Sequence, residues 1–138
     1  MRQQSPLLEL GAGTGAWTTL LKNAGAEVVG TDPNATGDIG YGFEAGTRAS
    51  LEPLTASQAI QKYPDRNVFC SWPTERGKWA LGAACQLNSD QTLALVEGSR
   101  TGTPGLNRYL LTRFDLVADI EIPQFPNCDD RLRIYRKR

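Results

Sequence analysis

The sequence lacks several features that would each indicate a definite class of protein. None of its 138 residues is a histidine, which excludes Ser-His-Asp and Cys-His catalysis and most catalytic zinc sites. The three cysteines, Cys70, Cys85 and Cys128, are odd in number and show no CxxC spacing, so we expect neither a disulfide framework nor a metal site. No apolar run reaches the roughly 18 residues of a membrane-spanning helix, and the N-terminal MRQQSP has no signal-peptide core. We therefore expect a cytoplasmic protein that has no membrane partner.

The chain also lacks an excess of charge of either sign. Its 15 lysines and arginines balance 15 acidic residues, so the molecule as a whole does not attract nucleic acid. Five of the basic residues nevertheless fall in the last eight residues, RLRIYRKR. They could form a small nucleic-acid or phosphate contact, or they could be solvated side chains that protect an edge strand. We favour the second interpretation and do not expect a nucleic-acid partner.

Segments with the character of strands and helices alternate along the chain. This order predicts a single domain over residues 1–138, of the α/β class, with a Rossmann-like, doubly wound and mainly parallel sheet. Thr55 is expected to cap one of the helices. The predicted strands are 6–10, 27–30, 67–70 and 92–96, with a weak one within 48–54, and the predicted helices are 16–23, 56–63, 79–87 and 104–112.

The C-terminal part follows a different pattern. Residues 114–122 and 132–135 are expected to be strands, and a proline-rich loop joins them where a helix would otherwise be found. This connection predicts an antiparallel hairpin at one edge of the sheet. Alternation within the first of the two strands predicts that Leu116, Ala118 and Ile120 share one face.

The stretch LLELGAGTGAW, residues 7–17, predicts a nucleotide cofactor site. A strand leads directly into Gly11, Gly13 and Gly15, and a helix follows. Glycines permit a tight turn and a close approach of the backbone to a ligand, while the helix N-terminus offers free N–H groups. Asp32 ends the next strand at the same sheet edge, where its carboxylate could accept the hydroxyls of a ribose.

Glu9 bears on which nucleotide is bound. Gly11, Gly13 and Ala16 also satisfy the dinucleotide pattern G-x-G-x-x-G/A, so an NAD-dependent oxidoreductase is one alternative. A carboxylate beside the loop would repel a pyrophosphate, but it would attract the cationic sulfonium and ammonium groups of S-adenosylmethionine. The chain also lacks a histidine or a Tyr-x-x-x-Lys group to move a proton in an oxidoreductase. The residues therefore favour S-adenosylmethionine as the cofactor.

ELGAGTG followed by VVGTDPN resembles the first two motifs of the class I S-adenosylmethionine-dependent methyltransferases. The resemblance implies a sheet of about seven strands whose final strand is reversed. It also implies that Glu9 helps to hold the methionine moiety, that the Gly11–Ala12–Gly13 segment wraps around it, and that Asp32 binds the ribose with Pro33 at the adenine. SWPT, IPQFP and DRLRIY are similar to segments of small methyltransferase-like bacterial proteins, which adds nothing about the substrate.

The same resemblance places the methyl acceptor beside Ser71, Trp72 and Pro73. Methyltransferases of amino nitrogens typically have Asp or Asn, two prolines and an aromatic residue here, and this chain departs from that pattern. Methylation of a nucleic-acid base is therefore not expected. Trp72 could stack on adenine or on an acceptor ring, or it could only pack at the sheet edge. Glu97, at the end of its strand, is our first choice for a general base, and Cys70 is expected to be an inert, buried cysteine.

These observations predict a methyltransferase that uses S-adenosylmethionine and a small-molecule acceptor. The alternative is a non-catalytic module of the same fold that binds S-adenosylmethionine or serves as a partner subunit, and the NAD-dependent oxidoreductase is third. A sheet this small would expose apolar surface on one face, so we expect a homodimer or a partner subunit. Residues 35–47, residues 123–126 or another subunit are expected to cover the acceptor.

Overall fold

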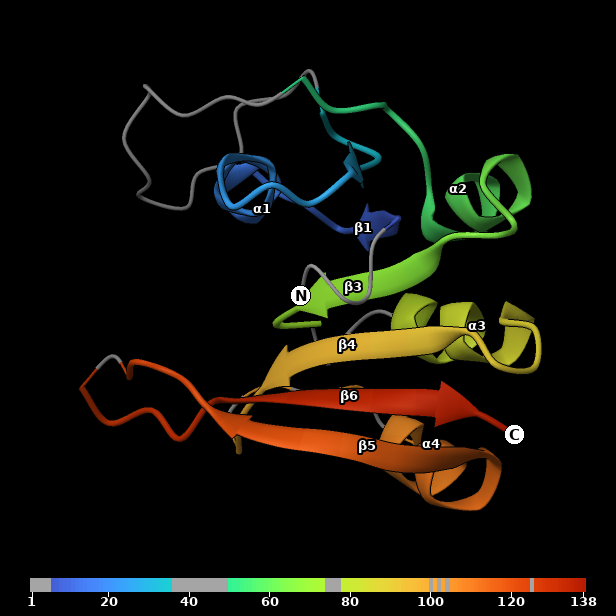
Figure 1. The fold of residues 1–138 in the computed structure, drawn as a ribbon, viewed down its shortest axis with the longest axis vertical. Helices are drawn as coiled ribbons and strands as arrows, with labels where there is room; N and C mark the ends of the chain where they lie inside the picture. Colours follow the sequence, from blue (N-terminus) through green and yellow to red (C-terminus); the bar gives the residue numbers. More distant parts are fainter. Residues whose placement is uncertain are drawn as a thin grey trace.

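The computed structural model describes residues 6–35, 50–73, 78–99, 101, 103, 105–124 and 126–138. Strands and helices alternate through β4, and the chain ends in a pair of strands (Figure 1). Most of residues 35–47, which are expected to cover the acceptor, therefore lie outside the described residues. The elements are β1 (Leu7–Leu10), α1 (Ala16–Asn23), β2 (Val28–Thr31), α2 (Ala56–Lys62), β3 (Asn67–Ser71), α3 (Trp79–Gln86), β4 (Thr92–Glu97), α4 (Leu106–Arg113), β5 (Phe114–Glu121) and β6 (Arg131–Lys137).

The strands form one sheet in the order β2-β1-β3-β4-β6-β5 (Figure 1). β1 pairs in parallel with β2 and β3, and β3 pairs in parallel with β4. β6 is antiparallel to both of its neighbours, β4 and β5. The predicted α/β class, the mainly parallel sheet and the antiparallel C-terminal hairpin are all confirmed. The four parallel strands bring their carboxyl ends to one edge of the sheet, where the predicted site residues lie.

The sheet has six strands and not the expected seven within the described residues. In the described part of the weak strand predicted within 48–54, residues 50–54, the pairing consists of one bridge, between Glu52 and Thr31. Around it, the N–H of Glu52 donates to the oxygen of Gly30 at 3.0 Å, and the N–H of Asp32 donates to the oxygen of Glu52 at 3.1 Å. The pairing stops there because the N–H of Leu54 turns back to the oxygen of Glu52, at 2.9 Å.

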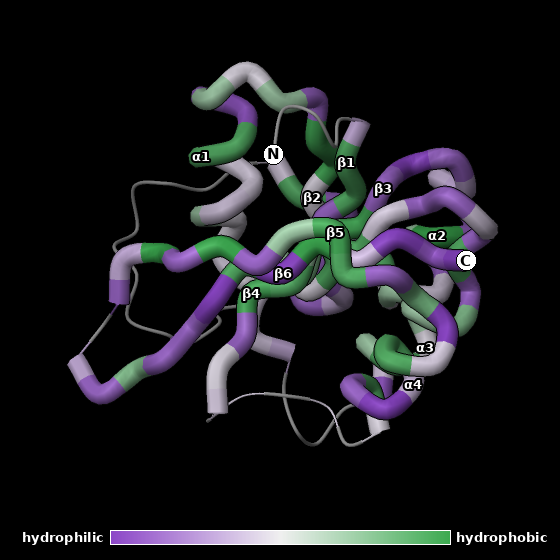
Figure 2. The backbone as a smooth tube through the Cα atoms, turned by 60° about the horizontal axis from the view of Figure 1, so that its bottom comes forward, coloured by the Kyte–Doolittle hydropathy of each residue, from purple (hydrophilic) through white to green (hydrophobic). Residues whose placement is uncertain are grey.

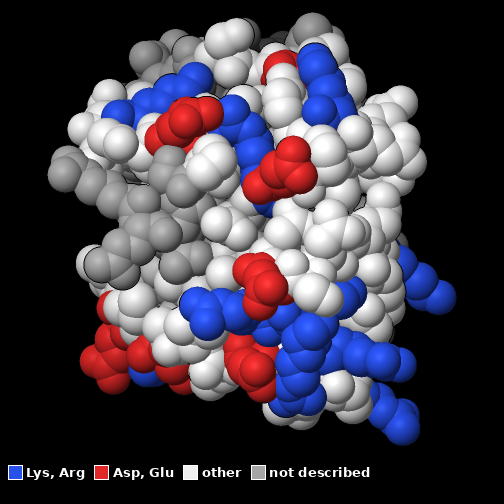
Figure 3. Space-filling view, turned by 45° about the vertical axis from the view of Figure 1, so that its right-hand side comes forward, with Lys and Arg blue, Asp and Glu red and all other residues white. Residues whose placement is uncertain are grey.

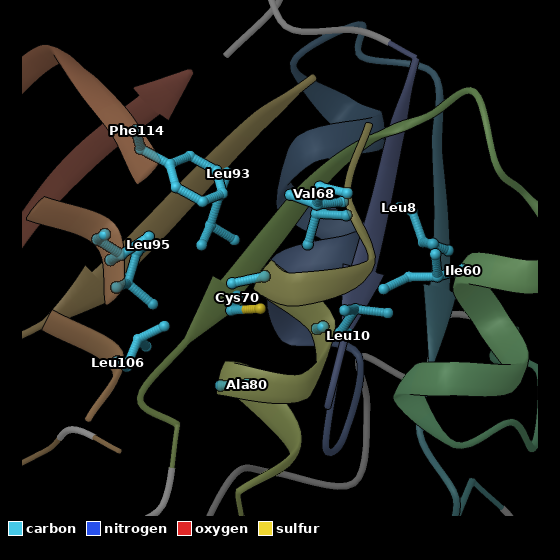
Figure 4. Packing of buried hydrophobic residues seen from close by; sticks show 14 of the residues in the cluster. Leu8, Leu10, Ile60, Val68, Cys70, Ala80, Leu93, Leu95, Leu106 and Phe114 are labelled. Carbon is cyan, nitrogen blue, oxygen red and sulfur yellow. The ribbon is translucent and has the colours of Figure 1, made fainter. Parts of the chain in front are cut away.

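Three helices, α2, α3 and α4, cover one face of the sheet. Side chains from all three meet those of β1, β3 and β4 in a single buried cluster, which Figure 4 shows from close by. α2 begins at the predicted cap: Thr55 accepts from the N–H of Gln58 at 3.2 Å, and the Gln58 side chain accepts from the N–H of Thr55 at 3.0 Å. This reciprocal capping satisfies two N–H groups that a helix start leaves free.

The opposite face is covered by α1 alone among the described helices. Leu21 of α1 packs with residues of β1, β2 and β3, and Val96 and Ile134 continue this second cluster along the sheet. Apolar segments run along β4 and β5 across this part of the molecule (Figure 2). Val117 and Ile120 of β5 are 47% and 44% exposed. No helix of the described residues is long and apolar enough to cross a membrane.

β5 departs from the predicted alternation. Leu116 pairs with Tyr135 and Ala118 pairs with Ile134, and the register shifts between these two pairs. Because Ile134 and Tyr135 are consecutive in β6, their side chains point to opposite faces, and so do those of Leu116 and Ala118. The expectation that Leu116 shares a face with Ala118 and Ile120 is therefore wrong, since a β-bulge adds one residue between them.

Basic and acidic side chains lie beside one another on the molecular surface (Figure 3). Arg131 pairs with Asp119 at 2.5 Å, and Arg138 pairs with Asp115 at 2.7 Å. The ammonium of Lys137 donates to the oxygen of Ala84 at 3.0 Å, at the end of α3. These contacts engage Arg131, Lys137 and Arg138 within the sheet and its neighbouring helix. The expectation that these residues belong to an edge strand is wrong, because β6 lies between β4 and β5 and β5 forms the edge.

Candidate functional site

The glycine loop connects β1 to α1 at the carboxyl edge of the sheet. Gly11, Gly13 and Gly15 have φ angles of +65°, +58° and +83°, a backbone conformation that residues with a Cβ rarely adopt. The N–H of Ala12 donates to the oxygen of Thr31 at 2.9 Å, which ties the loop to the end of β2. No described atom lies within 4 Å of the position that a Cβ on Gly13 would take. A ligand could therefore approach the backbone closely at Gly13.

Asp32 links the end of β2 to this loop. The residue is only 8% exposed. Its Oδ2 accepts from the N–H of Gly13 at 3.0 Å, and its Oδ1 accepts from the N–H of Asn34 at 2.8 Å. A carboxylate has about four acceptor positions, so each oxygen of Asp32 can accept one more hydrogen bond, for example from a hydroxyl. Pro33, the predicted adenine neighbour, follows at the same edge and is exposed.

Glu9 lies beneath the loop and is fully buried, at 0% exposure. The hydroxyl of Thr18 donates to its Oε2, whereas Oε1 has no hydrogen-bond partner among the described residues. Burial raises the pKa of Glu9 to about 7; the hydrogen bond from Thr18 opposes this rise and the charge of Asp32 adds to it. A carboxyl group with one unpartnered oxygen and no adjacent cation is costly to bury, and more so when it is ionised.

Thr18 and Gly30 are site residues that the sequence reasoning missed. Thr18 is fully buried in α1, and a Cβ on Gly30 would lie 2.3 Å from its Oγ1 and 2.5 Å from Cδ2 of Leu51. The bare backbone of Gly30 therefore makes the space from which Thr18 reaches Glu9. A glycine inside the strand sequence VVGT was a usable signal, because glycine in a strand often marks a close approach.

Trp79 approaches the loop from the start of α3. A Cβ on Gly11 would lie 3.0 Å from Cη2 of the indole and 3.1 Å from its Cζ2. The ring thus packs directly on the first glycine, and it also joins the cluster beneath α2, α3 and α4. Sequence reasoning placed Trp79 in a helix but gave no reason to bring it to the loop, since the contact depends on how α3 crosses the sheet.

Ser71 ends β3, and Trp72 and Pro73 follow it at the same edge of the sheet. Trp72 has a φ of +46°, which is unusual for a residue with a bulky side chain, and its N–H donates to the oxygen of Val96 at 2.8 Å. Its ring lies 6.3 Å from that of Trp17 in α1, centroid to centroid, and Trp17 in turn meets Phe69 edge-on at 5.5 Å. Trp72 therefore belongs to an aromatic cluster on the α1 face, and Pro73 is buried beside it.

Glu97 ends β4 at the same edge but on the other face. Alternation places it with Leu95, which packs beneath α3 and α4, whereas Ser71 shares the α1 face with Phe69. The structure thus brings Ser71 and Glu97 to one edge without turning them toward each other. Glu97 is 3% exposed; burial raises its pKa, and the charge of Arg133 opposes that rise. Cys70 is 1% exposed, and burial raises the pKa of its thiol far above the usual range, as expected for an inert cysteine.

Comparisons with solved structures identify the fold. An rRNA methylase from Streptococcus thermophilus is 17% identical, with a TM-score of 0.57 over 95% of this chain and 86% of that one. Magnesium protoporphyrin IX methyltransferase from Synechocystis PCC 6803, solved with bound SAM, is 17% identical, with a TM-score of 0.58 over 95% and 69%. A chain of a fibrillarin/Nop5p complex is 13% identical, with a TM-score of 0.59 over 99% and 74%.

No family model and no curated protein matches the sequence. The structural likeness nevertheless shows that the chain has the fold of the class I S-adenosylmethionine-dependent methyltransferases, as its glycine loop and second motif predicted.

Replacing Gly30 with alanine should destabilise the protein by about 1–3 kcal/mol, because the new methyl group would overlap with Thr18 and Leu51. Urea unfolding followed by circular dichroism would measure the loss. Gly82→Ala in α3 is the matched control: no described atom lies within 4 Å of its Cβ position, and the change should stabilise the helix by about 0.5–1 kcal/mol. Equal effects of the two substitutions would contradict the close packing of Thr18 on β2.

The stability of the ligand-free protein should depend on the ionisation of Glu9. The folded carboxyl titrates near pH 7 and the unfolded one near 4.5, so the folded state binds more protons between these values. Stability is therefore lost as the pH rises through this window, by roughly 3 kcal/mol in total. Because glutamine cannot ionise, the free energy of unfolding of Glu9→Gln should rise relative to that of the wild type by this amount between pH 4 and pH 8.

Urea unfolding of both proteins at several pH values in this range would test the prediction. Glu121→Gln, which alters an exposed carboxyl group on β5, is the control and should follow the wild-type curve. Curves for wild type and Glu9→Gln that run parallel from pH 4 to pH 8 would show that Glu9 titrates normally.

Proposed function

We propose that this protein is a methyltransferase that uses S-adenosylmethionine as its methyl donor. The observation that carries the proposal is the unpartnered Oε1 of Glu9, fully buried beneath the glycine loop. A positively charged ligand at the loop would relieve the cost of this carboxylate, and a negatively charged one would increase it. The sulfonium and ammonium groups of S-adenosylmethionine supply that charge, whereas the pyrophosphate of NAD does not.

The other loop residues fit the same cofactor. Asp32 retains free acceptor positions on both carboxylate oxygens, which suits the two hydroxyls of the adenosine ribose. Gly11, Ala12, Gly13 and Gly15 would hold the methionine end with their backbone, and Pro33 would border the adenine. When bound, the cofactor supplies an activated methyl group. The residues of this chain then need only to align it with an acceptor and exclude water.

The acceptor is proposed to be a small molecule that binds near Ser71, Trp72 and Pro73. The ion pairs of Arg131 with Asp119 and of Arg138 with Asp115 support this choice, because neighbouring carboxylates make these basic groups less available to phosphates. Glu97 remains the candidate general base. Its burial favours the neutral carboxyl, so it would act as a base only when an acceptor or the charge of Arg133 favours ionisation.

A second candidate is a module that binds S-adenosylmethionine without transferring its methyl group. It is favoured by the opposite facing of Ser71 and Glu97 and by the packing of Trp72 against Trp17. Incubation of the protein with a cell lysate and S-adenosylmethionine labelled in its methyl group distinguishes the two. Transfer of label to any acceptor, absent without the protein, would exclude the second candidate.

Isothermal titration with S-adenosylmethionine, S-adenosylhomocysteine and NADH tests the proposed cofactor. We expect the first two to bind and NADH not to bind. Asp32→Ala should weaken binding by about a hundredfold or more, because about two hydrogen bonds to a charged group are lost, each contributing roughly 1.5–3 kcal/mol. Asp65→Ala, an exposed residue beyond α2, is the matched control and should bind as the wild type does. Binding of NADH alone would favour the oxidoreductase instead.

We also propose that the protein forms a homodimer or binds a partner subunit. Apolar side chains remain exposed on β5: Val117 is 47% exposed and Ile120 44%, while Leu116, on the opposite face from Ile120, is 55% exposed. Exposed apolar side chains of this kind favour association. We expect light scattering to show a mass above that of the monomer at high protein concentration, and Val117→Lys to reduce it. A monodisperse monomer at every concentration would count against association with itself.

A further inference from the structure

No cation neutralises the carboxyl group of Glu9 among the described residues. The group that faces it from α1 is the hydroxyl of Thr18, which donates to Oε2. The negative charge of Asp32, at the end of β2, acts on it, and its register partner on β3 is the apolar Phe69, which shares the α1 face. These neighbours are neutral or negative. The empty site therefore favours the neutral, protonated form of Glu9, in keeping with the rise of its pKa to about 7.

Resting on the function proposed above, we propose that Glu9 loses its proton when S-adenosylmethionine binds and thereby makes the site prefer the cationic donor to its neutral product. The sulfonium carries a full positive charge that S-adenosylhomocysteine lacks, while the remaining groups of the two molecules are alike. At 0% exposure, the carboxylate is shielded from bulk water, so this difference of one charge is screened less than it would be in water. Glu9 is then a specificity-determining residue of the cofactor site.

In this proposal, the ionisation of Glu9 changes together with the charge on the sulfur of the cofactor during one reaction cycle. Methyl transfer breaks the bond between sulfur and the methyl carbon and leaves the electron pair on sulfur. The methyl carbon forms a bond to the acceptor atom, whose proton passes to solvent. The sulfur is then neutral, so the ionised form of Glu9 has lost its partner charge and takes up a proton from solvent. The site therefore holds the spent cofactor less tightly than the fresh one, which favours their exchange.

The test measures protons as well as affinity. Wild type and Glu9→Gln are titrated calorimetrically with S-adenosylmethionine and with S-adenosylhomocysteine at pH 6 and pH 8. Each titration is repeated in two buffers of different ionisation enthalpy, because the difference in heat gives the number of protons released. Gln keeps the shape of the side chain and a partner for Thr18 but cannot ionise, so it removes the contribution of Glu9 and retains that of the ligand's own amino group.

In wild type, S-adenosylmethionine should release close to one proton more than in Glu9→Gln at pH 6, and about a tenth of one at pH 8. Its affinity relative to that of S-adenosylhomocysteine should rise about tenfold from pH 6 to pH 8, because the proton no longer competes. In Glu9→Gln, this ratio should be constant. S-adenosylhomocysteine should release nearly the same number of protons from both proteins.

The outcomes separate this proposal from the proposed function. If both ligands bind and release equal numbers of protons from wild type, with an affinity ratio that does not change with pH, the role of Glu9 is wrong and the cofactor stands. If neither ligand binds to the folded wild type, the proposed function fails and this proposal fails with it. Should Glu9→Gln not fold, the comparison of the two ligands on wild type alone decides.

Discussion

A buried carboxyl group, Glu9, is the constraint on which the architecture of the site depends. Placing it between β1 and α1 requires a hydrogen-bond donor from the helix, and Thr18 supplies one. Thr18 in turn needs room, which β2 provides only because residue 30 is a glycine. The hydroxyl of Thr31 then donates to the backbone oxygen of Glu9 at 2.8 Å and fixes the strand behind it. Three elements are thus adjusted around one side chain that contributes no apolar packing.

A protein that is selected only for stability would place an apolar residue at position 9. Leu7, Leu8 and Leu10 of the same strand are all fully buried, so an apolar neighbour would fit the pattern. A buried polar group with an unpartnered oxygen costs free energy, and such costs persist mainly where function requires the group. Asp32 increases the cost through its own negative charge. The pair of acids is therefore understood best as part of a site that awaits positive charge.

The sequence predicted the features that depend on local chemistry. The glycine loop, the cap at Thr55 and the C-terminal hairpin each follow from residue types at short spacing, and each is present. Features that depend on distant contacts were not predictable in the same way. The bulge before Ala118 has no residue signal of its own, and the facing of Ser71 and Glu97 depends on where each strand begins its alternation. The sequence therefore placed Ser71 and Glu97 at one edge but could not show that their side chains lie on opposite faces of the sheet.

The single bridge that stands in place of the expected outer strand still holds the end of β2, next to Asp32. The single bridge at Glu52 satisfies the N–H of Asp32 and the oxygen of Gly30. Asp32 is the residue proposed to bind the ribose, and Gly30 is the residue against which Thr18 packs. The Glu52 side chain is anchored from α2, where Lys62 pairs with it at 2.7 Å and the hydroxyl of Tyr63 donates to it. Glu52 alone supplies the backbone acceptor for the N–H of Asp32 that a neighbouring strand would otherwise supply. Among the described residues, the sheet therefore presents the Asp32 carboxylate at its carboxyl edge with one bridge in place of an outer strand.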